Sequence, residues 1–117
     1  MTSNVLIWYP FDNGNSVGKL GSENGIIIRD REHPDGARIT LERDGKIAPF
    51  SITCGIYGWM VHTRFFSTEE EAEQELDKMQ VSLDEILRKI PLLEDPALDA
   101  KMEAAKESIS NFVEQYP

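Results

Sequence analysis

The single cysteine and one of the two histidines of this chain lie close together in the sequence, within residues 48–66. Cys54 and His62 are the residue types of a thiol nucleophile and its general base. Such a pair works only when the two side chains are within hydrogen-bond reach and a third group orients the base. Whether they meet depends on the elements that carry them.

Residues 48–66 predict two strands joined by the turn Gly55-Ile56-Tyr57-Gly58, with Cys54 opposite Trp59. Side chains alternate between faces along a strand. This register separates apolar from polar side chains, as in an antiparallel sheet buried on one side. The predicted buried face carries Phe50, Ile52, Cys54, Trp59, Val61 and Phe65, and the predicted open face carries Ser51, Thr53, Met60, His62, Arg64 and Phe66. Cys54 and His62 then point in opposite directions, so we expect a core thiol and no thiol enzyme.

The spacing of residues also tests for a phosphate-binding loop and for a metal site. The segment Gly14-Asn-Ser-Val-Gly18-Lys19 is one residue shorter between its glycines than a phosphate-binding loop, and Leu20 follows where that loop has Ser or Thr. A metal site needs several converging ligands, but the two histidines and the cysteine lack ligand spacing. The acidic residues Asp30, Glu32 and Asp35 lack the alternation of a calcium loop. We therefore expect no cofactor and no metal, and we expect His33 to be a turn residue.

The rest of the N-terminal half predicts more strands. His33-Pro34-Asp35-Gly36 has turn chemistry, and Asp44-Gly45 is a typical two-residue hairpin turn. The predicted meander has four strands, with Val5–Tyr9 as an optional fifth: Ile26–Arg31, Ala37–Arg43, Phe50–Cys54 and Trp59–Phe66.

The spacing of apolar residues changes after residue 66, from the alternation of a strand to the three- and four-residue steps of a helix. Ser67 or Thr68 can cap a helix that has apolar residues every three or four positions up to Ile90, and Asp95-Pro96 begins a second such helix. Strands followed by helices predict the α+β class. We expect one domain over residues 1–117, with an antiparallel four- to five-stranded meander sheet (1–66) and two C-terminal helices (67–117) packed on one face.

The net charge of −9 belongs to the C-terminal half. Residues 1–66 have seven basic and seven acidic residues, whereas residues 67–117 have five and fourteen. This balance argues against nucleic-acid binding, which needs clustered positive charge. No apolar run reaches membrane-spanning length and no leader segment is recognisable, so we expect a soluble, cytoplasmic protein that does not bind membranes.

The alternation places four arginines on the face away from the helices. A guanidinium group with apolar neighbours is typical of contact surfaces, because its planar fork binds carboxylates while its stem packs. The candidate binding residues are Arg29, Arg31, Arg38, Met60, His62, Arg64 and Phe66.

Two hypotheses of function remain. The first is a non-catalytic interaction protein that binds a partner protein or a second copy of itself, through the arginine-bearing sheet face or the acidic helices. The alternative is a small enzyme or ligand-binding domain with a pocket between the loop 12–25 and the sheet.

Overall fold

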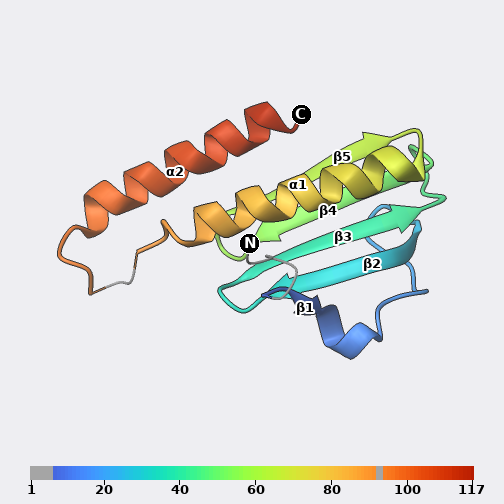
Figure 1. The fold of residues 1–117 in the computed structure, drawn as a ribbon, viewed down its shortest axis with the longest axis horizontal. Coiled ribbons are helices and arrows are strands. Elements are labelled where there is room, and N and C mark those ends of the chain that lie inside the picture. Colours follow the sequence, from blue (N-terminus) through green and yellow to red (C-terminus); the bar gives the residue numbers. More distant parts are fainter. Residues whose placement is uncertain (1–6, 92–93) are drawn as a thin grey trace.

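Five antiparallel strands in sequence order form one sheet, and two helices follow (Figure 1). A computed structural model describes residues 7–91 and 94–117. The elements are β1 (Tyr9–Pro10), a 3-10 turn (Phe11–Gly14), β2 (Ile26–His33), β3 (Ala37–Arg43), β4 (Phe50–Ile56), β5 (Met60–Phe66), α1 (Glu69–Leu87) and α2 (Leu98–Gln115). The predicted α+β meander with C-terminal helices is confirmed. No helix among the described residues is long and apolar enough to cross a membrane.

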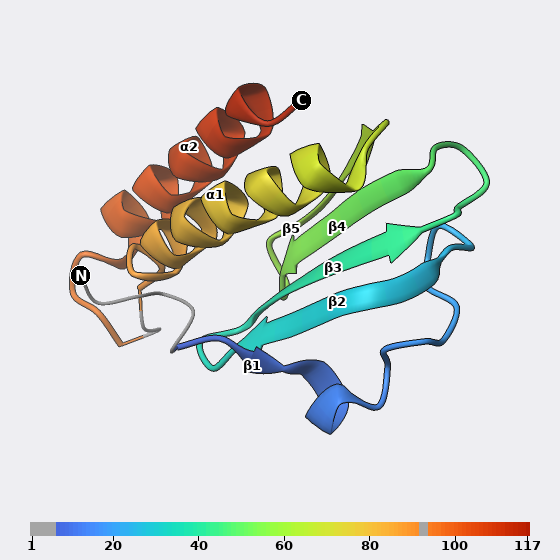
Figure 2. The same cartoon turned by 45° about the vertical axis from the view of Figure 1, so that its right-hand side comes forward.

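Both helices lie on the same side of the sheet, which leaves the other side open (Figure 2). Helix α1 begins at Thr68, whose Oγ1 accepts the backbone N–H of Glu71 at 3.3 Å, as an N-cap does. Its apolar stripe packs on β3, β4 and β5. The core between the two layers consists of sheet residues Ala37, Ile39, Leu41, Ile52, Cys54 and Ile56 and helix residues Ala72, Leu76, Met79, Leu83, Ile86 and Leu87.

Helix α2 begins two residues later than the predicted Pro96 start. The Asp95 carboxylate instead accepts the N–H of Ala97 at 2.8 Å and forms a turn ahead of the helix. Only Ala105 and Phe112 within α2 are buried, and Tyr116 follows them into the core. The helix is therefore attached mainly by its C-terminal end.

Of the predicted strand Val5–Tyr9, Val5 and Leu6 lie outside the described residues. Of the described part only Tyr9 belongs to a strand: Tyr9 and Pro10 pair with Glu32 and Arg31 of β2. One edge of the sheet is thus a two-residue strand that contains a proline.

The connection between β3 and β4 is longer than predicted. Residues 44–49 form a loop, closed by a 2.7 Å hydrogen bond from the Asp44 N–H to the Pro49 carbonyl, in place of a two-residue turn. Ile39 therefore pairs with Cys54 and not with Phe50. The register moves by four residues, an even number, so the facing of β4 stays as predicted.

The turn between β4 and β5 is where the predicted facing fails. It spans Ile56 to Trp59, with the Trp59 N–H donating to the Ile56 carbonyl at 2.8 Å and Gly58 at φ 83°. A type II turn needs a positive φ at its third residue, which favours glycine there. Cys54 consequently pairs with His62 and not with Trp59. This shift is odd, so every side chain of β5 lies on the face opposite to the predicted one.

Strand β2 also has the opposite facing to the predicted one, because its hairpin loop is one residue shorter: His33 pairs with Ala37, which leaves Pro34-Asp35-Gly36 as the loop. Further along the strand, a β-bulge at Ile28 inserts one extra residue between Ile27 and Arg29. Arg29, Arg31 and His33 pair with Leu41, Ile39 and Ala37, so they share the face covered by α1.

A buried carboxylate fixes the glycine-rich loop. Glu42, which is 1% exposed, accepts the N–H groups of Glu23 at 3.2 Å and Gly25 at 3.0 Å. A Cβ on Gly21 would lie 2.3 Å from the Glu42 Cδ, so only glycine allows this approach. We call this contact the Glu42 latch. It holds residues 21–25 against the open side of the sheet.

The facing of β5 can be tested through stability. Phe66→Ala should lower the free energy of unfolding by about 3 kcal/mol, because it removes a buried phenyl group. Val61→Lys should change it by less than about 0.5 kcal/mol, because Val61 is 78% exposed. Urea denaturation followed by circular dichroism measures both. If Val61→Lys proved the more damaging change, the register predicted from the sequence would be the better description.

Candidate functional site

Three of the four candidate arginines lie under α1, so their predicted place on the open face is wrong. Arg29 pairs with Glu73 at 3.0 Å, and Arg31 hydrogen-bonds Gln80 and lies 3.9 Å from Asp77. From the opposite flank, Arg64 of β5 pairs with Glu75 at 2.8 Å. The shorter hairpin loop between β2 and β3 and the odd register shift in β5 cause the change. These guanidinium groups hold α1 in place and are not free to bind a partner.

His33 belongs to the same layer and is 3% exposed, contrary to the expected turn position. Its Nδ1 accepts the N–H of Asp35 at 3.0 Å, so Nε2 carries the proton and donates to Asp84 of α1 at 2.7 Å. Arg88 also binds the Asp84 carboxylate. Burial raises the pKa of Asp84, but the hydrogen bonds from Arg88 and His33 outweigh it, so the pKa lies below its ordinary value.

The other three candidates, Met60, His62 and Phe66, were expected on the open face and instead also turn toward the helices. Phe66 is buried, and Met60 packs against the core. His62 Nε2 donates to the carbonyl oxygen of Tyr116, and its ring lies edge-on to Phe112. Of these three residues, His62 attaches the C-terminal end of α2 to the sheet.

Cys54 and His62 are therefore cross-strand partners on one face, and the geometric reason for dismissing a thiol dyad is wrong. The chemical conclusion has different support. Burial raises the pKa of the Cys54 thiol to about 12, with only partial compensation from Arg64. A thiol that stays protonated is a poor nucleophile, and the Nε2 of His62 already donates to Tyr116.

Arg38 is the one candidate arginine on the open face. Its Nε and Nη2 bind the two oxygens of Asp30 at 2.9 and 2.6 Å, and its guanidinium group stacks 3.6 Å from the Phe11 ring centroid. The Asp30 side chain is fully buried and also accepts the Thr40 hydroxyl at 3.0 Å. Asp30 thus neutralises Arg38 and fixes its position, so this fork is not an open anion site.

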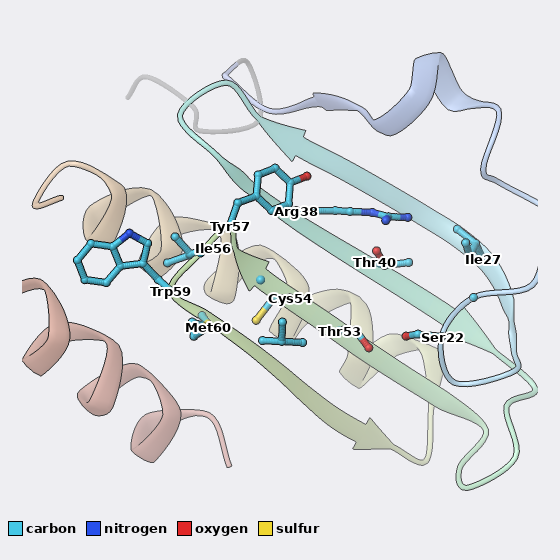
Figure 3. A pocket seen from close by; sticks show the side chains of 14 residues that line it. Ser22, Ile27, Arg38, Thr40, Thr53, Cys54, Ile56, Tyr57, Trp59 and Met60 are labelled. Carbon is cyan, nitrogen blue, oxygen red and sulfur yellow. The ribbon is translucent and has the colours of Figure 1, made fainter. Parts of the chain in front are cut away.

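Beside Arg38 the open face is hollowed into a concavity of about 730 Å³ (Figure 3). We call it the sheet-face groove. Gly55 contributes to its floor, because a glycine has no side chain to fill the space between Thr53 of β4 and Tyr57 of the following turn. Its lining includes Ser22, Ile27, Arg38, Thr40, Thr53, Gly55, Tyr57 and Val61.

Hydrogen bonds hold both ends of the groove. At one end the Tyr57 hydroxyl donates to Glu32 at 2.6 Å; burial and then this hydrogen bond raise the pKa of Tyr57 to about 12. At the other end the Glu42 latch holds the glycine-rich loop in place, and Gly21 and Ser22 of this loop line the side of the groove. The predicted pocket between the glycine-rich loop and the sheet therefore has a counterpart in the structure.

The groove residues Thr40, Thr53, Gly55, Tyr57 and Val61 were not among the predicted site residues. One signal in the sequence could have indicated them: a glycine inside a strand often marks a place where another group approaches the backbone closely. The predicted turn includes Gly55, and this placement conceals the groove.

The polar groups beside the groove already have partners. Asp30 binds Arg38 and Thr40, Tyr57 binds Glu32, and the hydroxyls of Thr53 and Thr63 lie 3.2 Å apart. Among residues 7–91 and 94–117, no three His, Cys, Asp or Glu side chains are placed to hold a metal ion. The arrangement suits the binding of an apolar group better than acid–base or metal chemistry.

The buried Asp84 contact generates a pH prediction. Asp84→Asn should lower the free energy of unfolding by about 2 kcal/mol at pH 7, because charge-assisted hydrogen bonds are lost. Since the pKa of Asp84 is depressed below its ordinary 3.8, its contribution is present above pH 3.8 and is lost as pH falls through the folded-state value. Urea denaturation between pH 7 and about pH 2 should show the two proteins converging in acid. A constant difference over that range would contradict the role assigned to this carboxylate.

The Cys54 thiol generates a second prediction. At pH 8 a disulfide reagent should label the folded protein at least about 1,000-fold more slowly than the chain in concentrated urea, because reaction requires unfolding. Because the pKa is raised on folding from 9.0 to about 12, the stability contributed by the neutral thiol is complete below pH 9.0 and decreases above it. Rapid labelling of the folded protein would restore thiol chemistry as a hypothesis.

No protein-family model, curated protein or solved structure matches this chain in three comparisons. Its function must therefore be inferred from the chemistry of its own surface. The features available for that purpose are an uncovered sheet face, an apolar groove with satisfied polar ends, and arginines that are already committed to α1.

Proposed function

We propose that this protein is a non-catalytic binding protein that receives apolar side chains of a partner protein in the sheet-face groove. The observation that carries the proposal is the groove itself, an apolar hollow of about 730 Å³ on the uncovered side of the sheet. The working face is thus still the open face of the sheet, but its chemistry is apolar and not arginine-based.

The exposed side chains around the groove support this proposal. Tyr57, Val61 and Phe65 are 52%, 78% and 44% exposed; Val61 and Phe65 belong to the open side of β5, and Tyr57 lies in the turn that joins β4 to β5. Contact surfaces are enriched in aromatic residues and depleted in charge at their centres. Arg38 at the rim presents only the N–H groups that Asp30 leaves free, which suits a neutral acceptor such as a peptide carbonyl.

The fixed positions of the groups around the groove also favour binding. Arg38 is fixed by Asp30 and Phe11, and the loop wall is fixed by Glu42, so little side-chain freedom remains to be lost when a partner binds. The acidic helices would act at longer range, because a net charge of −9 attracts basic proteins.

A small apolar molecule is the second candidate occupant. The groove volume lies within the range of roughly 300–1,000 Å³ that is usual for small-molecule sites. The open, shallow placement on a sheet and the exposed Val61 favour a protein partner, which would cover these residues as well as fill the hollow.

The test uses peptides selected from a displayed random library against the wild-type protein, with affinities measured by calorimetry. Gly55→Val should fill the floor and weaken the selected apolar peptides at least about tenfold. Val61→Asp should have a similar effect because it places a charge at the rim. The control is Val81→Asp on the exposed side of α1, which should leave the affinity unchanged.

Two outcomes would contradict the proposal. One is that selected peptides bind Gly55→Val and wild type equally well. The other is that no peptide is selected while the fluorescent probe anilinonaphthalene sulfonate binds wild type and not Gly55→Val, which would identify a small-molecule site. Light scattering of the free protein tests the remaining alternative: a dimer abolished by Val61→Asp would make a second copy the partner.

A further inference from the structure

The edge formed by β5 is a second candidate surface, distinct from the sheet-face groove. The Trp59 N–H closes the turn on the Ile56 carbonyl, with Ile56 opposite Met60. Hydrogen-bonded pairs alternate along an antiparallel ladder. Residues 60, 62, 64 and 66 therefore bond to β4, and the backbone groups of Val61, Thr63 and Phe65 face outward. The close Thr53–Thr63 hydroxyl contact of 3.2 Å agrees with this phase.

This edge lacks the features that usually protect a strand from pairing. Natural edges are blunted by short strands, proline, lysine or charged side chains. The opposite edge follows that rule, since β1 has two residues and one of them is Pro10. Strand β5 has seven residues, and its open-side row is Val61, Thr63 and Phe65, without charge. The charge of Arg64 is turned under α1 to Glu75.

Helix α2 extends beyond this edge on the covered side. In the view onto the open face, α1 lies behind the strands and α2 lies past the outer side of β5 (Figure 3). Phe112 and Tyr116 attach the helix to His62, Arg64 and α1. Further toward its N-terminus, a hollow of about 430 Å³ separates it from the β4–β5 turn; its lining is Gly58, Trp59, Met102, Lys106, Ile109 and Ser110.

The spacing leaves room for one more strand. Packed helices lie about 8–10 Å apart and neighbouring strands about 4.8 Å apart. A helix next to α1, which covers β3 to β5, therefore lies above the position where a sixth strand would pair with β5. Such a strand would cover the apolar side of α2 that the five-stranded sheet leaves partly exposed, at Met102, Ile109 and Val113.

Antiparallel pairing with β5 of a second copy does not fit this position. A twofold axis between two β5 strands would bring the α2 helix of each copy over the β5 of the other. The two helices would then meet near an axis where the strands are only about 4.8 Å apart, closer than packed helices allow. The occupant is therefore a lone extended segment.

The charge at the end of β5 specifies that segment further. Glu69, Glu70 and Glu71 begin three residues after Phe66, are all exposed, and form no ion pair within the described residues. The N-terminal end of a segment antiparallel to β5 would reach this first turn of α1. Lysine or arginine at that end would complement the carboxylates.

We propose that the β5 edge binds an extended segment of a partner protein as a sixth antiparallel strand, with basic residues at its N-terminal end and alternating apolar residues that fill the hollow beneath α2. Recognition of this kind takes its affinity from main-chain hydrogen bonds and its specificity from pockets for alternate side chains. The proposal does not rest on the sheet-face groove, so either site can fail without the other.

The test uses a synthetic peptide with three basic residues followed by alternating valine and serine. On binding, hydrogen exchange at the amides of Val61, Thr63 and Phe65 should slow at least about tenfold. Thr63→Pro removes one outward N–H and should weaken the peptide by about tenfold, the effect expected from one hydrogen bond, whereas Thr63→Ala keeps the N–H and should bind within about twofold of wild type. A peptide with its basic residues moved to the C-terminal end should bind more weakly.

Met102→Glu gives an independent check, because it places a charge in the hollow without altering the strand; it should also weaken the peptide. The edge proposal is overturned if Thr63→Pro and Met102→Glu both fold and bind like wild type. It is also overturned if protection appears only at Thr53, Gly55 and Tyr57, which would instead support the groove. A dimer that protects Val61, Thr63 and Phe65 without peptide would show that the occupant is a second copy.

Discussion

The structure depends on how α1 is held against the sheet. Its apolar stripe, from Ala72 to Leu87, would by itself allow the helix to slide or rotate over a flat layer of Ile and Leu side chains. Polar contacts on both flanks prevent this, with Arg29, Arg31 and His33 of β2 on one side and Arg64 of β5 on the other. Much of the acidity of α1 is therefore internal to the fold, where it orients the helix instead of facing a partner.

This use of charge determines which surfaces remain for binding. With three arginines under α1 and Arg38 paired with the buried Asp30, the open face is left with threonines, Tyr57, Val61 and Phe65. The face is then apolar, and Gly55 gives it a hollow. The β5 edge and the groove share Val61, so occupation of either surface would alter the surroundings of the other.

The sequence predicts the elements well and their facing less well. The spacing of apolar residues and the capping chemistry are local properties, so the four main strands, a helix cap at Ser67 or Thr68 and the α+β class follow from nearby residues. Which face of the sheet a side chain occupies is harder to predict, because a register shift of one residue moves every side chain of the strand to the other face. Gly55 and Gly58 both have turn chemistry, and only the positive φ of Gly58 shows which of them is in the turn. The hairpin between β2 and β3 presents the same difficulty, because His33-Pro34-Asp35-Gly36 allows a loop of four residues or of three, and only the pairing of His33 with Ala37 shows which one forms. The site was misplaced for these two reasons.

The β-bulge in β2 also bears on how such a chain can evolve. Point substitutions in β2 alter one side chain at a time, but straightening the bulge at Ile28 would shift the residues before it by one position. Ile27 pairs with Glu42 and hydrogen-bonds to the glycine-rich loop, and it would then turn toward α1, whereas Arg29, Arg31 and His33 would keep the facing that the hairpin gives them. Related chains are thus expected to vary in composition along this strand while conserving the bulge.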